Sequence, residues 1–336
     1  TAGISGARRI NGGGAMRERE TPSDAFNGKH IVDVLSEATG RERVHRDWSL
    51  APYTTFRVGG LADFFLEART EKELVAVRKA ASQLNIPVTM LGGGSNVLIS
   101  DRGVRGLVVR ARHGEIYCPT ADSVRASAGV TLNGLVRWMV RRGISGIETW
   151  AGTPGTVGGA VAGNAHFGGR LLSERIRGVG LVEADGHQVD VLASEMNFGY
   201  DKSRIQNTKE LIVWAEFETA QASPTDLRRA ARRSLEFRKS TQPLAEPSAG
   251  CVFRNPMMTD TELTSGIPCS AGALIDAAGL KGCAEGMARV SERHANFFVT
   301  RRNATAADVK VLMERCKETV EQKFNVKLVP EISLLG

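Results

Sequence analysis

The sequence predicts an α+β fold in which short strands and helices alternate around two glycine-rich loops. Three observations support this prediction. Apolar runs of strand length alternate with segments of helical periodicity, two stretches are dense in glycine, and 42% hydrophobic with 24% charged residues is ordinary for a globular protein. The 336 residues suggest roughly two or three domains. No run approaches about 18 apolar residues, so no membrane span is expected.

The first part of the chain alternates strand, helix and turn signals. Residues 1–29 carry few large apolar groups, so we expect a disordered tail, followed by a short helix at 30–39. A helix is expected after Thr70, which can cap it, because acidic residues in its first turn and an apolar face follow. The strands expected around this helix are 62–67, 87–91, 97–99 and 107–109.

From residue 116 onward the pattern repeats in a larger form. A strand at 123–128 precedes a helix at 131–142, which Gly143 should end. A hairpin around Asp185 and Gly186 and a strand at 211–219 follow. The second half is expected to begin with a basic helix at 224–239, whose residues available for a core are Leu227, Ala231, Leu235 and Phe237. An irregular segment at 241–250, helices at 270–279 and 306–324, and strands at 294–300 and 328–335 are expected to follow.

The two glycine-rich stretches, 91–96 and 152–164, are the clearest functional signal. Glycine allows a positive φ and lets another group approach the backbone closely. A dense glycine run is unfavourable inside a regular helix or strand, by roughly 0.5–1 kcal/mol per glycine. It can instead present backbone N–H groups to an anion, usually a phosphate. Tight turns are the alternative, but two such loops favour a nucleotide.

Charge and cysteine content narrow the possible ligands. The net charge of +7 is spread along the chain without an aromatic-rich RNA motif, so an anionic substrate is favoured and no nucleic-acid partner is expected. The five cysteines are odd in number and form no CxxC pair. This pattern argues against a disulfide framework and a zinc site and for a reducing compartment, so we expect no metal.

Two residues stand out by their setting. Glu331 is a carboxylate in an otherwise apolar segment, where its burial would be costly unless it is paired or its pKa shifts. Cys251 follows a glycine in an irregular loop and could donate a proton. A surface-facing carboxylate and an inert core thiol are the alternatives. His166 and His294 could carry protons or could simply pack.

Seven stretches of the chain form a recognisable set. They are YTTFRVGG at 53–60, LGGGSNVL at 91–98, GTPGTVGG at 152–159, PSAGCVFRNP at 247–256, AAGLKG at 277–282, VSERHAN at 290–296 and PE at 330–331. Together and in this order they resemble one family, UDP-N-acetylenolpyruvoylglucosamine reductase, a flavin enzyme of UDP-N-acetylmuramate synthesis. The resemblance runs from about Trp48 to Gly336 and looks like the shorter subtype, which lacks a tyrosine-bearing insertion.

The resemblance implies an FAD-binding domain of two α/β subdomains, of the vanillyl-alcohol-oxidase type, plus an α+β substrate-binding domain. The implied parts are a tail at 1–29, FAD-binding subdomains at 30–110 and 111–223, a substrate-binding domain at 224–323, and a C-terminal strand at 324–336 that returns to the FAD domain. It further implies FAD as cofactor, NADPH as co-substrate and a UDP-sugar substrate, in a monomeric enzyme of the bacterial cytoplasm that serves peptidoglycan precursor synthesis.

The resemblance also assigns roles to residues. Cys251 stands where the family has a serine acid, and Glu331 matches the family's C-terminal carboxylate. The substrate-binding residues it implies are Tyr200, Arg238, Asn255, His294 and Asn296. The FAD-binding residues it implies are Tyr53, Thr55, Arg57, Gly92, Gly93, Gly94, Ser95, Asn96, Gly152, Thr153, Pro154, Gly155, Thr156, Gly158, Gly159, Gly163 and Asn164.

One position departs from the family pattern. The family usually has Tyr-Arg-x-Ser, and its arginine helps to neutralise the substrate carboxylate and the enolate. This chain has Tyr200-Asp201-Lys202-Ser203-Arg204, so the residue at 201 has the wrong sign. We therefore expect Arg204 or Lys202 to supply the positive charge and include Arg204 among the catalytic residues.

Two other functions remain open at this level. The chain could be another FAD-linked oxidase or dehydrogenase with the same flavin fold. It could also be a flavin-binding relative with impaired catalysis, for which Asp201 and Cys251 are the motivating residues.

Overall fold

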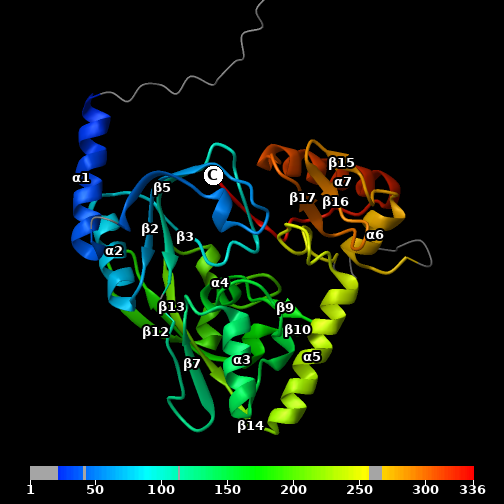
Figure 1. The fold of residues 1–336 in the computed structure, drawn as a ribbon, viewed down its shortest axis with the longest axis horizontal. Helices are drawn as coiled ribbons and strands as arrows, with labels where there is room; N and C mark the ends of the chain where they lie inside the picture. The colour runs from blue at the N-terminus through cyan, green and yellow to red at the C-terminus, as the bar shows by residue number, and fades with distance from the viewer. Residues whose placement is uncertain (1–21, 41–42, 113, 257–266) are drawn as a thin grey trace, which may run out of the picture.

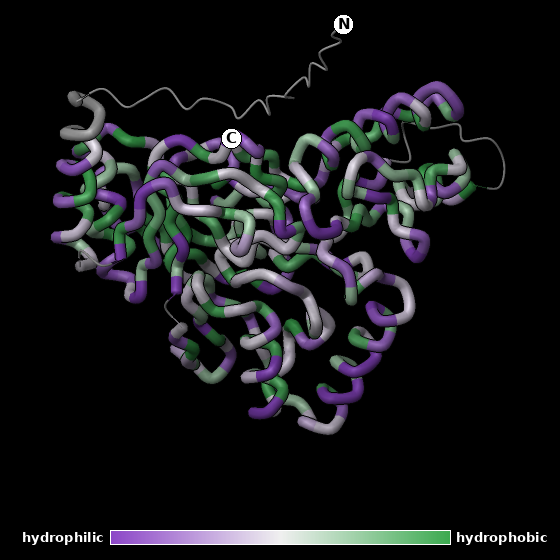
Figure 2. The backbone as a smooth tube through the Cα atoms, turned by 45° about the horizontal axis from the view of Figure 1, so that its top comes forward, coloured by the Kyte–Doolittle hydropathy of each residue, from purple (hydrophilic) through white to green (hydrophobic). Residues whose placement is uncertain are grey.

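The chain folds into three parts that follow one another along the sequence, and its C-terminal end returns to the first part (Figure 1). The computed structural model describes residues 22–40, 43–112, 114–256 and 267–336, with 22–27 described by their backbone alone. Figure 2 shows hydrophobic residues concentrated in the strands and inner segments, whereas the long helix at one edge, α5, is largely hydrophilic.

The first part is a four-stranded sheet with two helices. The strand order is β1 (His45–Ser49), β2 (Leu61–Ala68), β5 (Val104–Ala111) and β3 (Val88–Met90). The pair β1·β2 is antiparallel and the other pairs are parallel. Helices α1 (Pro22–Thr39) and α2 (Glu71–Gln83) contribute to one core with this sheet, whose buried side chains include Leu35, Leu66, Leu74 and Leu107.

The second part is a five-stranded antiparallel sheet. Its order is β12 (Gln188–Leu192), β11 (Ile176–Val182), β13 (Leu211–Glu218), β7 (Ser123–Ser127) and β6 (Ile116–Tyr117). Helices α3 (Leu132–Arg142) and α4 (Val157–Ala162) enclose a core with it that includes Trp150 and Phe217. Val182, Leu211 and Val213 also belong to the core of the first part, so the two sheets share buried side chains. Two short pairs lie beside them, β8 (Ile144–Ser145) with β14 (Ala220–Gln221) and β9 (His166–Phe167) with β10 (Arg170–Leu171).

The third part follows helix α5 (Pro224–Thr241), which runs along the edge of the second part (Figure 1). A three-stranded antiparallel sheet, β15 (Ala284–Glu285), β16 (Ala288–Val290) and β17 (Phe298–Thr300), lies next to α6 (Ala271–Ala277) and α7 (Ala306–Phe324). The core contains Phe253, Phe298 and Leu312, and it also takes in Phe56 from the first part.

The C-terminal segment joins the third part to the first. Strand β18 (Ser333–Leu335) pairs in parallel with β4 (Val97–Ile99), directly after the first glycine-rich loop. Just before it, Pro330 forms an isolated bridge with Phe253. The last residues of the chain therefore lie between two parts that are remote in sequence.

Most of the expected elements are present. The Thr70 side chain accepts a hydrogen bond from the Glu73 N–H at 3.1 Å and caps α2 as expected. Gly143 ends α3 with a φ of +72°, and α7 covers the expected 306–324. The hairpin at Asp185 and Gly186 joins β11 to β12.

Some expected boundaries are wrong. Helix α1 begins at Pro22, so part of the expected tail is helical, while residues 1–21 lie outside the described chain. The C-terminal strand is shorter than expected because Pro330 and Glu331 lie before it in a bridged segment. The core face expected on the basic helix is only partly buried. Leu227 is 4% exposed and Ala231 packs against the core as expected, whereas Leu235 and Phe237 are 37% and 56% exposed.

The second glycine-rich stretch contains a helix that the sequence did not predict. Gly158 and Gly159 lie inside α4, whose first turn is capped by the Thr156 hydroxyl accepting from the Gly159 N–H at 3.3 Å. A Cβ at Gly158 would lie 2.8 Å from the Cβ of Ala128. Close packing against the neighbouring sheet thus outweighs the low helix propensity of glycine here.

The capping box of α7 provides a test of the third part. Replacing Thr305 by Ala removes the hydroxyl that accepts from the Asp308 N–H at 3.0 Å, so the protein should lose about 1 kcal/mol. The melting temperature should fall by about 2–4 °C, which a thermal-shift experiment on the flavin-loaded protein would measure. Thr305→Ser keeps the hydroxyl and should melt like the wild type; equal loss in both variants would contradict the capping role.

Candidate active site

The two glycine-rich loops are in direct contact. A Cβ on Gly93 would lie 2.6 Å from the Cα of Gly155, which belongs to the second loop. Gly94 has a φ of +63°, and a Cβ there would lie 2.0 Å from the carbonyl oxygen of Tyr53. No larger residue fits at these positions without backbone movement, so the loop backbones themselves form the wall of the site.

The first loop presents backbone donors that the protein does not use. Among the residues with described positions, no acceptor takes the N–H groups of Gly92, Gly93 or Gly94. The carbonyl side of the loop is held by Thr55, whose N–H donates to the Gly94 oxygen at 2.9 Å. Free N–H groups on a glycine cradle suit the diphosphate of a dinucleotide, so the loops fit the cofactor that the sequence implies.

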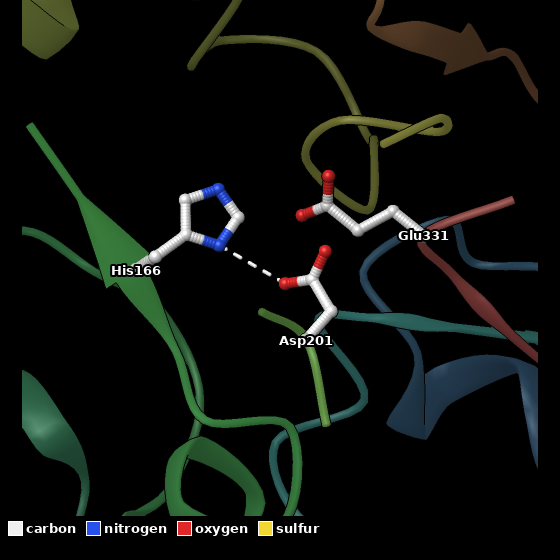
Figure 3. A group of neighbouring side chains, drawn as sticks. All are labelled: His166, Asp201 and Glu331. Carbon is white, nitrogen blue, oxygen red and sulfur yellow. Dashed lines mark hydrogen bonds and ion pairs between the residues drawn. The ribbon is translucent and has the colours of Figure 1, made fainter. Parts of the chain in front are cut away.

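Beside these loops, three side chains from distant segments point toward a common centre (Figure 3). His166 comes from β9, Asp201 from the turn at 199–202, and Glu331 from the segment before β18. One polar atom from each lies within 4.8 Å of the others. The sequence singled out Glu331, but it gave no reason to pair His166 with Asp201.

Backbone contacts hold Glu331 and Cys251 in the same region. The Glu331 N–H donates to the Val252 oxygen at 2.8 Å, and Cys251 forms an isolated bridge with Phe297. The Asn96 side chain donates to the Glu331 carbonyl at 3.4 Å. The first glycine loop, the loop around Cys251 and the C-terminal segment therefore meet at one point.

Burial keeps both candidate acids protonated. Desolvation, followed by the neighbouring Asp201 carboxylate, raises the pKa of Glu331 to about 8. Desolvation also raises the pKa of the Cys251 thiol well above its usual range, and Glu331 and Asp201 add to this effect. Near neutral pH both groups hold a proton, which is the state that a proton donor needs.

Arg238 brings a buried positive charge to the same region. It is only 7% exposed, donates to the Thr153 hydroxyl at 2.7 Å and lies 3.9 Å from the centre of the Phe167 ring. Desolvation lowers its pKa to about 10, while the nearby Cys251 acts in the opposite direction. Its Nε finds no hydrogen-bond partner in the described structure, so this cation is suited to bind an anionic group.

Arg254 is a second positive group, and the sequence analysis gave it no role. Its Nε lies 3.6 Å from Oδ2 of Asp201, and Arg254 lowers the pKa of Glu331 against the larger effect of burial. The residue lies within the stretch PSAGCVFRNP, between Cys251 and Asn255. Its position next to two candidate residues was the only signal that could have identified it.

The structure does not bring Arg204 to the cluster formed by His166, Asp201 and Glu331. Its guanidinium pairs with the Glu210 carboxylate, and its Nε donates to Glu210 at 2.9 Å. The carboxylates that raise the pKa of Arg204 are Glu210, Glu195 and Glu183, none of which lies in the cluster. Lys202 is exposed. The geometry thus favours Arg238 and Arg254 as the positive groups of the site.

Several expected ligand-binding residues position the site through the backbone. Asn164 is fully buried, donates to the Gly199 oxygen at 2.8 Å and accepts from the Ser173 N–H at 2.9 Å. The Asn296 side chain accepts a hydrogen bond from the Phe253 N–H at 2.9 Å and donates one to the Phe253 oxygen at 2.7 Å. These two amides hold the turn that carries Asp201 and the loop that carries Cys251.

The remaining expected residues are divided between the site and its surroundings. Tyr200 places its hydroxyl 3.2 Å from Nε2 of His166 and is 41% exposed. His294 accepts from the Asn296 N–H at 3.2 Å, and burial lowers its pKa, so it supports the loop as a neutral ring. Asn255 accepts from the Ala271 N–H at 3.1 Å, at the start of α6.

Comparison with known proteins decides the family. Residues 242–335 match the model described as UDP-N-acetylenolpyruvoylglucosamine reductase, C-terminal domain, and residues 62–192 match an FAD binding domain. The UDP-N-acetylenolpyruvoylglucosamine reductase 2 of Symbiobacterium thermophilum is 37% identical over 88% of this chain and 92% of its own length. The corresponding reductase of Acaryochloris marina is 39% identical over 86% of this chain and 91% of its own.

The chain belongs to the UDP-N-acetylenolpyruvoylglucosamine reductase family. The crystal structure of the family member from Thermus caldophilus superposes with a TM-score of 0.73 at 31% identity, covering 88% of this chain and 99% of that one. The expected family, the FAD-binding fold, FAD as cofactor and NADPH as co-substrate of the reductase are confirmed. No helix in the described regions is long and apolar enough to cross a membrane.

The contact between the glycine loops predicts how FAD is held. Gly93→Ala forces the two loops apart, because its Cβ would lie 2.6 Å from the backbone of Gly155. The purified variant should carry little flavin, measured as absorbance near about 450 nm relative to protein. Gly114→Ala is the matched control, since a Cβ at this position would have no heavy atom of the described residues within 4 Å, its chain neighbours aside. Normal flavin content in Gly93→Ala would exclude this loop from the cofactor site.

Loss of the positive charge at Arg204 and at Arg254 should affect the reaction differently. Arg204→Gln should leave kcat/KM of the reductase within about twofold, because its partner Glu210 lies outside the cluster. Arg254→Gln removes a cation beside Asp201 and Glu331 and should lower kcat/KM by about tenfold or more. Steady-state NADPH oxidation measures both, and a larger effect at Arg204 would reverse this assignment.

Proposed function

We propose that this chain reduces the enolpyruvyl group of UDP-N-acetylenolpyruvoylglucosamine to the lactyl group of UDP-N-acetylmuramate, using NADPH and bound FAD, in peptidoglycan precursor synthesis. The observation that carries this proposal is the meeting of two protonated acids, Cys251 and Glu331, with two arginines next to the glycine cradle. Reduction of an unsaturated acid needs a proton donor and a positive group for the developing enolate, and this arrangement offers both.

The glycine loops would hold the cofactor. The N–H groups of the loop at 92–96 would bind its diphosphate, and the backbone at 153–156 would form the opposite wall. The chemistry that FAD supplies when bound is transfer of a hydride from NADPH to the enolpyruvyl methylene carbon. The net change adds one hydride and one proton to the double bond and leaves NADP⁺.

The chain's own residues would supply the proton and manage the charge. Cys251 would give its Sγ proton to the carbon that bears the carboxylate, and the thiolate would then take a proton back from solvent. The pKa of the thiol is raised above its usual range, so the proton is present at the pH of the reaction. Serine has this place in the family, and a thiol gives up its proton more readily than a hydroxyl does.

Arg238 and Arg254 would bind the substrate carboxylate and stabilise the enolate formed from it. Buried donors that are already oriented are effective there, because no reorganisation is needed when the charge develops. Glu331, protonated near neutral pH, would add a neutral hydrogen-bond donor close to the reacting carbons, so that it does not repel the substrate carboxylate.

We also propose the finer organisation of the enzyme. It would act as a monomer in the bacterial cytoplasm, where a UDP-sugar and NADPH are available and where free cysteines such as Cys118 stay reduced. The working division would be FAD-binding subdomains at 30–110 and 111–223, a substrate-binding domain at 224–323 and a returning strand at 324–336.

Substitution of Cys251 tests the proton donor. Cys251→Ala should lower substrate-dependent NADPH oxidation by about 10²–10⁴-fold, the usual contribution of a general acid, while flavin content stays normal. Cys251→Ser restores a donor and should recover most of the loss. An alanine variant as active as the wild type would remove Cys251 from the mechanism. Bound flavin without any oxidation stimulated by the enolpyruvyl sugar nucleotide would indicate a catalytically impaired relative.

The raised pKa of Glu331 predicts a pH-dependent cost in stability. The folded protein holds this proton up to about pH 8, whereas the unfolded chain loses it near the ordinary value of 4.5. The contribution of this carboxyl group to the free energy of unfolding is therefore greatest below pH 4.5, and it is lost as the pH rises through about 8. The difference in melting temperature between Glu331→Gln and the wild type should shift in favour of the variant by a few degrees between pH 6 and pH 9, because the amide does not ionise. The variant should also lose activity. If the melting temperatures of both proteins depended on pH in the same way across this range, a buried, protonated Glu331 would be contradicted.

A further inference from the structure

Asp201 is a buried carboxylate whose two oxygens have different hydrogen-bonding environments. Oδ1 lies 3.0 Å from Nδ1 of His166 in a hydrogen bond. Oδ2 is buried and has no hydrogen-bond partner among the described residues, although Nε of Arg254 lies 3.6 Å away and is itself without one. His166 is thus the hydrogen-bonded partner of the Asp201 carboxylate. Arg254 donates from Nη2 to the backbone oxygen of Asp201 at 3.4 Å, and its Nε forms an ion pair with Oδ2 at 3.6 Å without a hydrogen bond.

His166 is placed to carry a positive charge. Its Nδ1 faces Asp201, and its Nε2 lies 3.2 Å from the Tyr200 hydroxyl, with the two rings 4.5 Å apart. An imidazolium donates from both nitrogens and so satisfies both neighbours. The Asp201 hydrogen bond raises the pKa of His166, while burial opposes this rise.

The charge balance around Asp201 depends on whether His166 is protonated. A buried carboxylate needs a cation, and the two cations within reach of Asp201 are His166 and Arg254. If His166 is neutral, Arg254 is the remaining partner and has only a short way to move to bond Oδ2. Arg254 would then be committed to Asp201 and could no longer serve an anion in the site.

We propose that His166 is a positioning residue whose imidazolium neutralises the Asp201 carboxylate, so that the positive charge of Arg254 is available to the carboxylate of the UDP-sugar substrate. This inference rests on the proposed function of the site. It also accounts for the acidic residue at 201, because the histidine at 166 compensates for its charge. A metal ion bound by His166, Asp201 and Glu331 fits less well, because Arg254 faces the same carboxylates.

The proposal predicts a pH dependence with a definite sign. The titratable and charged groups that face His166 are Tyr200 and Asp201 from the turn, Glu331 from the C-terminal segment and, across Asp201, Arg254. As the pH rises through the raised pKa of His166, Arg254 should turn to Asp201. KM for the UDP-sugar should then increase, with a smaller change in kcat.

A double-mutant experiment separates this role from a structural one. His166→Gln cannot be protonated and should raise KM for the UDP-sugar by about tenfold. Asp201→Asn removes the charge that needs compensation, so the double variant His166→Gln/Asp201→Asn should return to within about threefold of wild type. A double variant as impaired as His166→Gln, or an unchanged KM in His166→Gln, would overturn the proposal.

The matched control is His187→Gln, because the side chain of His187 is 66% exposed and lies in the hairpin of the second sheet. Flavin absorbance and melting temperature of each variant establish that the holoenzyme is folded. Reduction of the bound flavin by NADPH, measured alone by stopped flow, should be equal in wild type and His166→Gln, since the substrate carboxylate takes no part in it. A slowed flavin reduction would count against a role limited to the substrate.

A direct measurement keeps the inference testable if His166→Gln does not fold. In the wild-type holoenzyme labelled with ¹³C at histidine Cε1, one signal should titrate above the ordinary value of about 6.5 and shift down in Asp201→Asn. No such signal, or one that Asp201→Asn leaves unchanged, would overturn the proposal. A wild type that does not reduce the enolpyruvyl sugar nucleotide would instead refute the proposed function, whatever the titration shows.

Discussion

The backbone contact between the two glycine-rich loops is the constraint on which the rest of the site depends. Gly93 and Gly155 approach so closely that a single methyl group would separate the loops. The loops therefore touch through their backbones, and no acceptor among the described residues takes the N–H groups of Gly92, Gly93 or Gly94. A side chain at Gly93 would force the two loops apart.

The C-terminal segment brings the candidate acid Glu331 next to this junction. Strand β18 pairs with β4 immediately after the first glycine loop, and Glu331 bonds the loop that carries Cys251. The same short segment thus links the third part of the molecule to the first glycine loop and carries the Glu331 carboxyl group. Because these contacts are backbone hydrogen bonds, they fix the direction of Glu331 more firmly than side-chain packing alone would.

The electrostatics of the site follow from burial. Desolvation holds the protons on Cys251 and Glu331, which would otherwise be poor donors or repelling charges. Asp201 is the one carboxylate of the central cluster that the structure pairs by a hydrogen bond, and its partner is a histidine. The negative charge of Asp201 is therefore met by a titratable ring, with Arg254 beside it and the buried Arg238 in the same region.

The sequence by itself determined the features that depend on neighbours along the chain. The Thr70 cap, the stop at Gly143 and the limits of α7 are set by residues within a few positions of one another, so local patterns reveal them. The glycine loops, Cys251 and Glu331 were also found, because their residue types are unusual for their setting and match the family's motifs.

The tertiary structure decided which charges meet. Arg204 and Arg254 are both arginines near motif residues, but Glu210 is close to the first in space and Asp201 to the second. His166 and Asp201 are separated by a stretch that includes two strands of the second sheet, and only the folding of that sheet brings them within 3.0 Å. Electrostatic partnership depends on distance through space and on burial, and neither quantity can be read from the order of residues.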